Sequence, residues 1–174
     1  MKMKKVLIAV AAIALAVSAQ AASFKWTATA ITPDPDGGAV TTYTAYLIDA
    51  SVVSYADAQA AIADGDVSFI AGSAILDSAN TVAGGANARI SATGGTTVAD
   101  KSYTAYFVVL NNATTPTQAF LSNKTMTGTG NSMTDTAFAF QSQAGGTWVA
   151  VPEPTSGLLM LVGLGALALR RRRA

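Results

Sequence analysis

Apolar and polar residues alternate along the chain from Phe24 to Ile31. One face of this segment would carry Phe24, Trp26, Ala28 and Ala30. The opposite face would carry Lys25, Thr27 and Thr29. A period of two residues is typical of a β-strand with one buried face, so the sequence predicts a half-buried strand here.

Similar segments rich in Thr, Ala, Val and aromatic residues predict further strands. They lie at residues 41–48, 67–76, 88–92, 103–110, 118–121, 136–141 and 147–151. Turn-forming residues separate them at 33–38, 111–112 and 145–146. Short strands at this spacing indicate an all-β fold, which we expect to be a single β-sandwich-like domain over residues 22–150.

Two of these segments resemble each other, because Tyr43-Thr-Ala-Tyr46 and Tyr103-Thr-Ala-Tyr106 are each followed by two apolar residues. In the first, Tyr43, Ala45 and Leu47 alternate with Tyr46 and Ile48, which predicts a strand covered on both faces. A match this short favours two equivalent core strands over the alternative, a duplicated half-domain.

One segment has helical rather than strand periodicity. Ser54 and Asp57 have the spacing of a capping box, and the alanine-rich run to Ala63 follows them. Tyr55, Ala58 and Ile62 would form one stripe of this short helix. We expect it to pack across an end or edge of the sheets, and the alternative is a lid over a site.

The N-terminal pattern is that of a secretory signal peptide at residues 1–21. Lys2, Lys4 and Lys5 precede an apolar run over residues 6–17. Ala19 and Ala21 then supply the small residues that signal peptidase reads, so we predict cleavage after Ala21, with Ala22 as the alternative. The run is too short for a durable membrane anchor, which is the other interpretation.

The C-terminal pattern predicts a membrane segment at about residues 155–169. Fifteen residues of helix span only about 22 Å at ~1.5 Å per residue, against ~30 Å of hydrocarbon. The cluster Arg170, Arg171, Arg172 and Arg173 favours the membrane nevertheless, because arginines can reach the headgroups and hold this end in the cytoplasm. The alternative is a buried core helix with a solvated basic end.

Just before this segment stands Pro152-Glu153-Pro154, and Glu153 is the only glutamate in the chain. The prolines keep the stretch extended and remove backbone donors, so it predicts an accessible linker outside the membrane. Pro-Glu-Pro, an apolar segment and an arginine cluster in this order make residues 151–174 resemble the PEP-CTERM sorting signal of exosortase-processed bacterial envelope proteins. The resemblance implies that an exosortase, a membrane-embedded cysteine transpeptidase, recognises Pro152, Glu153 and Pro154, cleaves nearby and transfers the new carboxyl end to an acceptor.

Charge and composition exclude several classes of function for the central domain. Apart from the two ends it has four basic residues against nine aspartates, a net charge of −5. We therefore exclude nucleic acid and anionic lipid as its partners. The chain contains no cysteine and no histidine, which excludes thiolate chemistry, serine–histidine triads and histidine–zinc sites.

The remaining candidates for chemistry are aspartates. They are Asp34, Asp36, Asp49, Asp64, Asp66, Asp77, Asp100 and Asp135. A pair could run glycoside hydrolysis, and 34–38 or 64–66 could help to bind Ca²⁺. We interpret most as turn residues instead, and we predict no enzyme, no cofactor and no metal site.

Aromatic side chains could stack on sugars, but Trp26 and Trp148 both lie on apolar faces and should be buried. We therefore predict an exported protein, anchored in the inner membrane until it is processed and then found on the cell surface or outside the cell. Its expected role is structural or adhesive, and the alternative is a polysaccharide-binding module of the envelope or biofilm matrix. Its expected partners are signal peptidase, an exosortase, the membrane before processing and an exopolysaccharide.

Overall fold

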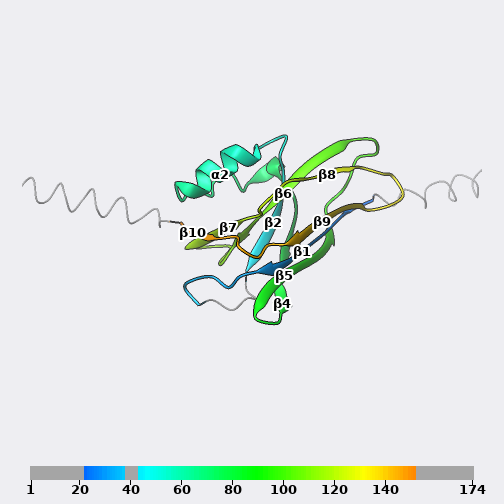
Figure 1. Ribbon diagram of the computed structural model, residues 1–174. Helices are drawn as coiled ribbons and strands as arrows, with labels where there is room; N and C mark the ends of the chain where they lie inside the picture. Colours follow the sequence, from blue (N-terminus) through cyan, green and yellow to red (C-terminus); the bar gives the residue numbers. More distant parts are fainter. Residues whose placement is uncertain (1–21, 38–42, 152–174) are drawn as a thin grey trace, which may run out of the picture.

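Strand β1 (Phe24–Ile31) lies inside a four-stranded sheet (Figure 1). The structure is a computed structural model that describes residues 22–37 and 43–151. The strand order is β4 (Val82–Gly84), β5 (Asn87–Gly94), β1 and β9 (Thr136–Ser142). Strand β5 runs antiparallel to β1 and β9 runs parallel to it. The parallel pair joins β1, the first strand of the described domain, to β9, the next-to-last. The four-stranded sheet is therefore complete only when nearly the whole domain is present.

A second sheet contains six strands. They are β2 (Thr44–Asp49), β3 (Ile75–Asn80), β6 (Ser102–Leu110), β7 (Gln118–Leu121), β8 (Met126–Thr129) and β10 (Trp148–Ala150). The order is β10-β7-β6-β2-β3, and β8 pairs with the first half of β6, beyond the end of β7. All neighbours in this sheet are antiparallel.

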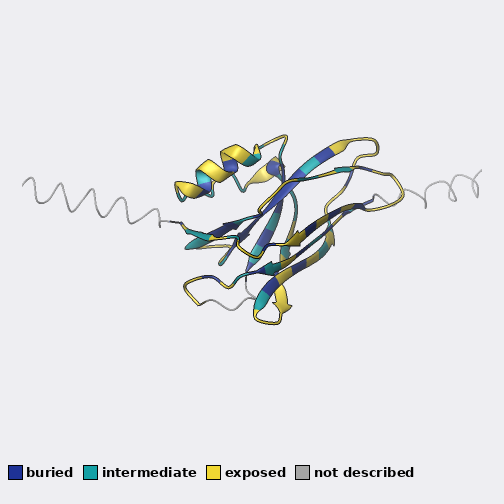
Figure 2. Ribbon diagram, viewed as in Figure 1, coloured by how far each residue is buried: buried dark blue, intermediate teal, exposed yellow. Residues whose placement is uncertain are grey.

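The two sheets pack face to face across an aromatic core. Buried residues, dark blue in Figure 2, lie on strands of both sheets. The four-stranded sheet contributes Trp26 and Phe140, and the six-stranded sheet contributes Phe107 and Phe120, all of them buried. The rings of Phe107 and Phe140 meet edge to face with centroids 5.0 Å apart, a favourable geometry for aromatic pairs. The β-rich fold with one short helix and two sheets is confirmed for the described residues.

The related segments at Tyr43 and Tyr103 form β2 and β6, which are adjacent in the six-stranded sheet. Both tyrosine rings are buried in the core, and each hydroxyl accepts a hydrogen bond from a backbone N–H 2.9 Å away, Asp34 for Tyr43 and Val98 for Tyr103. The first tyrosine of each motif is therefore buried in the same way and makes the same kind of hydrogen bond. As predicted, β2 is covered on both faces, with Leu47 in the core between the sheets and Ile48 in a second cluster outside.

Helix α2 (Tyr55–Ala63) begins where the capping box predicted. The Ser54 hydroxyl accepts from the Asp57 N–H at 3.1 Å and donates to the Asp57 carboxylate at 2.7 Å. The expected position of the helix was wrong, because α2 covers the outer face of the six-stranded sheet rather than an end or edge. That face is apolar on β2, β6 and β7, and Ala58 and Ile62 pack against it. The helix therefore forms a third layer over part of the sandwich.

Strand β1 has the predicted bounds, but at its end Ile31 rather than Ala30 lies on the buried face. Its register with β5 shifts between Ala28 and Ile31, and Ala30 has a φ of +58°. A bulge of this kind moves the next residue to the opposite face. Ile31 is consequently buried in the core while Ala30 is only half-buried.

The predicted strand at residues 67–76 is wrong over most of its length. Turns occupy residues 67–71, a single 3-10 turn, η1 (Gly72–Ala74), follows, and β3 begins only at Ile75. The half-buried side chains of Val67, Phe69 and Ile70 pack against the cluster under α2 from this irregular segment. Two short strands were not predicted, β4 and β8, which are polar or exposed and contain glycine.

Candidate functional site

The last strand of the domain, β10, lies at an edge of the six-stranded sheet and leads to the C-terminal tail. Its three residues pair with β7, Trp148 opposite Phe120 and Ala150 opposite Gln118. The Val151 N–H then donates to the Thr117 carbonyl at 2.8 Å. Val151 is only 9% exposed and packs in the cluster under α2. The fold therefore holds the chain up to the residue that precedes Pro152.

Trp148 fixes this strand to the rest of the sandwich. Its indole N–H donates to the Thr32 carbonyl at 2.8 Å, joining β10 to the end of β1. The centroid of its ring lies 5.0 Å from the ring centroid of Tyr43 and 5.6 Å from the ring centroid of Phe120. The preceding Gly146 packs so closely against Phe120 that a Cβ atom would overlap the ring. The prediction that Trp148 is buried is correct in part, because the side chain is half-buried.

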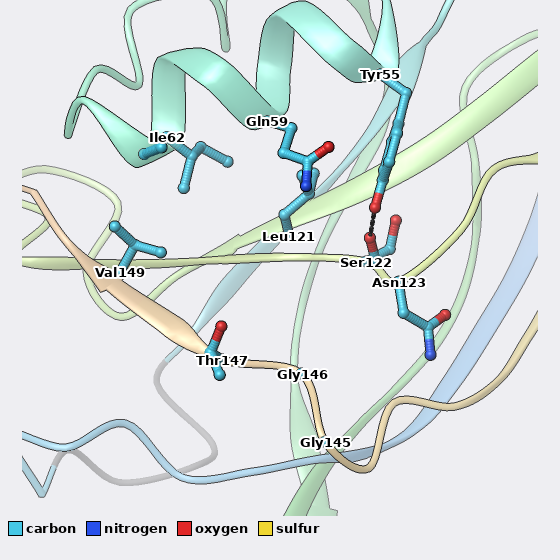
Figure 3. A pocket seen from close by; sticks show the side chains of 11 residues that line it. Tyr55, Gln59, Ile62, Leu121, Ser122, Asn123, Gly145, Gly146, Thr147 and Val149 are labelled. Atoms are coloured by element: carbon cyan, nitrogen blue, oxygen red, sulfur yellow. Dashed lines mark hydrogen bonds between the residues drawn. The ribbon is translucent and has the colours of Figure 1, made fainter.

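A groove of about 270 Å³ separates α2 from β7 and β10 (Figure 3). Ile62, Leu121 and Val149 supply its apolar surface. The Tyr55 ring lies at one end, where its hydroxyl donates to the Ser122 carbonyl at 2.6 Å. The remaining lining residues are small or uncharged and polar, namely Gln59, Ala63, Asn123, Gly145, Gly146 and Thr147. The groove thus combines an apolar surface with amide and hydroxyl groups, and no charged side chain lines it.

Tyr55 and Tyr106 stand together under the start of α2, with ring centroids 5.5 Å apart. Burial raises the pKa of both phenols, and the nearby Asp57 carboxylate adds to the effect at Tyr106. The Tyr106 hydroxyl donates to the Val53 carbonyl at 3.1 Å. Both phenols therefore stay neutral donors that tie the helix to the sheet, rather than acids or bases available for proton transfer near neutral pH.

Two of the candidate aspartates, Asp49 and Asp66, accept local hydrogen bonds. Asp49 accepts from the Ser51 N–H and Asp66 from the Ser68 N–H two residues on, the predicted turn geometry. That bond lowers the pKa of Asp66. Asp49 also lies 3.7 Å from the Lys101 ammonium.

Three other candidates hold distant parts of the chain together. Asp77 accepts from the indole N–H of the buried Trp26 at 2.7 Å, Asp36 from the Thr117 hydroxyl at 2.9 Å, and Asp135 from the Ser23 N–H at 3.0 Å. Asp64 ends α2, and Asp100 has a φ of +60° between β5 and β6. Within residues 22–37 and 43–151 no three carboxylates gather at one point as a metal site would require.

The tryptophans and tyrosines were the candidates for stacking on sugars. Trp26 is fully buried, as predicted, and the side chains of Tyr43, Tyr103 and Tyr106 are buried as well. Tyr46, Tyr55 and Trp148 are half-buried. None of these seven side chains belongs to the exposed residues of the domain, so the structure offers no open aromatic platform on the part that it describes.

The predicted sorting and cleavage residues lie outside the described residues. They are Ala19, Ala21, Pro152, Glu153, Pro154, Arg170, Arg171, Arg172 and Arg173. Their roles stay predictions, as does the membrane segment at about 155–169. In the described part of the chain, no helix has the length and hydropathy needed to cross a membrane. The groove beside β10 was not predicted, because it depends on the contact between α2 and residues more than 60 positions further along the chain.

Comparison with known families identifies the C-terminal end. Residues 150–173 match the family model of the PEP-CTERM protein-sorting motif. Neither the curated proteins nor the solved structures contain a match to the chain. The motif implies an exported protein that is membrane-associated and then sorted to the surface, with an exosortase as its processing partner. The match begins at Ala150, so it overlaps the end of β10, the last strand of the domain.

Proposed function

Because the chain carries a PEP-CTERM protein-sorting motif, we propose that an exosortase processes it and delivers its domain to the cell surface or the extracellular matrix. There the domain serves a structural or adhesive role without catalysis. The observation that carries the proposal is the match at residues 150–173, which overlaps the end of a domain that is folded up to Val151. Signal peptidase removes residues 1–21 in this scheme.

The character of the domain supports a structural role. Its core contains many large aromatic residues and no cysteine, so its stability does not depend on the redox state of the compartment. The aspartates discussed above serve turns, strand contacts and ion pairing, which accounts for them without a reaction.

A pair of proline variants tests the sorting step. Pro154→Ala alters the predicted recognition motif, whereas the matched control Pro116→Ala alters a loop between β6 and β7. We expect the Pro154→Ala chain to accumulate in the inner membrane and the Pro116→Ala chain to reach the surface like the wild type. Normal surface delivery of both variants would contradict recognition of the motif.

The adhesive role needs its own measurement. Cells that lack the gene should attach to a surface or to one another less well than wild-type cells. Complementation with the full chain should restore attachment, and complementation with a chain ending at Val151 should not, because that product is released. Equal attachment by the wild-type, deletion and both complemented strains would exclude an adhesive role and leave only a structural one.

Polysaccharide binding is the second candidate, and the outer face of the four-stranded sheet favours it. Strands β1, β4, β5 and β9 contain no acidic residue although the domain is acidic overall. Lys25 and Arg89 are exposed on this face, together with the small polar residues Thr29, Ser91 and Thr93. Hydroxyl groups and two cations suit a neutral or acidic glycan chain.

This second candidate is tested by retention of the domain on exopolysaccharide from its own host. Lys25→Ala and Arg89→Ala should each weaken retention, and added salt should weaken it further. Lys124→Ala is the matched control, because Lys124 is exposed in the loop that leads to β8. Retention that is absent, or that all three variants preserve, would exclude binding through this face.

A further inference from the structure

The groove between α2 and β10 lies beside the point where the domain ends. Val149, which lines the groove, is two residues from Val151. Val151 and Ile62 belong to the same apolar cluster. The groove therefore lies next to the last strand of the described domain, the strand that leads to Pro152.

The length of the intervening chain sets how near a processing enzyme must come. Only Pro152, Glu153 and Pro154 separate Val151 from the predicted membrane segment at about residues 155–169. Three fully extended residues reach at most about 10 Å. An enzyme that binds these three residues at the membrane surface must therefore approach the domain to within about that distance. At such a distance its surface and that of the domain meet.

The chemistry of the groove selects a protein rather than the lipid surface as its occupant. Ile62, Leu121 and Val149 form an apolar surface, and no lysine or arginine lines the groove. The domain carries a net charge of −5, which disfavours contact with anionic headgroups. An apolar surface rimmed by the uncharged polar groups of Gln59, Asn123 and Thr147 matches the usual anatomy of a protein interface.

We propose that the exosortase binds this groove, so that the enzyme contacts the domain next to the motif as well as the motif itself. The proposal rests on the processing step proposed above. The occupant is an apolar side chain from an extracytoplasmic part of the enzyme. A groove of 270 Å³ has room for one or two such side chains.

The test uses the full chain in its native host and follows the conversion of precursor to processed protein by pulse-chase labelling. Ala63→Arg and Thr147→Arg each place a long charged side chain at an exposed position that lines the groove. Ala60→Arg is the matched control, an exposed alanine of the same helix that does not line the groove. We expect roughly tenfold slower conversion of the two groove variants and a wild-type rate for the control. Tenfold corresponds to about 1.4 kcal/mol of lost docking free energy.

A linker variant separates loss of docking from damage to the fold. Ten Gly and Ser residues between Val151 and Pro152 add an average reach of about 17 Å, enough for the enzyme to act without touching the domain. In this background Ala63→Arg should have no effect on the rate of conversion. A rate still lowered in the presence of the linker would contradict docking at the groove.

The outcomes distinguish the two proposals. If wild-type protein is not processed by the exosortase at all, the proposed function fails. If wild-type processing needs the exosortase but the groove variants are converted at the wild-type rate, only the docking proposal is overturned. Groove variants that are processed normally but lose retention on exopolysaccharide would overturn it as well, because the occupant would then be a saccharide.

Discussion

Replacement of Trp148 should release β10, the strand that holds the start of the sorting motif. Trp148 lies on a three-residue edge strand that pairs only with β7. Its contacts with the Thr32 carbonyl, the Tyr43 ring and the Phe120 ring connect this strand to the rest of the sandwich. Trp148→Ala removes all three contacts at once.

The expected loss follows from the burial and the hydrogen bond. Replacing a buried tryptophan with alanine costs about 3–5 kcal/mol, and roughly half of that applies to a half-buried ring. The lost hydrogen bond adds about 1 kcal/mol. We therefore expect β10 to be destabilised by about 2.5–3.5 kcal/mol relative to the open form. Trp148→Phe keeps most ring contacts and loses only the bond to Thr32, so about 1 kcal/mol is expected.

Amide hydrogen exchange at Val151 measures this opening directly, because its N–H is bonded to the Thr117 carbonyl. In the domain from Ala22 to Val151, exchange at this amide should accelerate about 60- to 300-fold for Trp148→Ala, at ~1.4 kcal/mol per tenfold. For Trp148→Phe it should accelerate about fivefold. Unchanged exchange in Trp148→Ala would show that Trp148 does not hold the strand.

Three further predictions concern the fold that supports this strand. Ser54→Ala should lower the free energy of unfolding by about 1 kcal/mol in urea titrations, because the Asp57 N–H loses its cap; no change would mean that the cap is replaced by water. Asp77→Ala should lower the free energy of unfolding by about 1–3 kcal/mol, because it leaves the buried Trp26 N–H without an acceptor. Asp77→Asn should be more stable than Asp77→Ala, because the amide oxygen can still accept this bond. Equal unfolding free energies for Asp77→Ala and Asp77→Asn would refute a stabilising bond between the two sheets. The raised pKa values of Tyr55 and Tyr106 mean that the folded state holds these protons more tightly than the unfolded state. Their contribution to stability is present below about pH 10, the usual tyrosine pKa, and is lost as the pH rises through the folded values, so urea unfolding at pH 8 and pH 11 should show lower stability at pH 11.

Local patterns predicted much of the fold. The bounds of β1 and β7 and the start of α2 follow from alternation, turn residues and a capping box, all of which are encoded within a few neighbouring residues. Residues 67–76 show the limit, because their apolar side chains are buried under α2 from turns, and burial alone does not distinguish a turn from a strand.

Long-range contacts account for the other differences. The bulge at Ala30 depends on how β1 registers with β5, and the position of α2 depends on the apolar outer face that β2, β6 and β7 build together. Of the candidate site, the sorting motif could be identified from the order of its residues. The groove could not, since Tyr55 and Ser122 meet there only after the sheet has formed.

The most direct test of exosortase sorting is the intact mass of the protein recovered from each envelope fraction and from the medium of its native host, with and without the exosortase. We expect an exported form that begins at Ala22, contains the whole domain through Val151 and ends near Pro152 to Pro154, and we expect it only when the exosortase is present. An exported chain that keeps Arg170 to Arg173, or that persists in the inner membrane whether or not the enzyme is present, would contradict exosortase sorting.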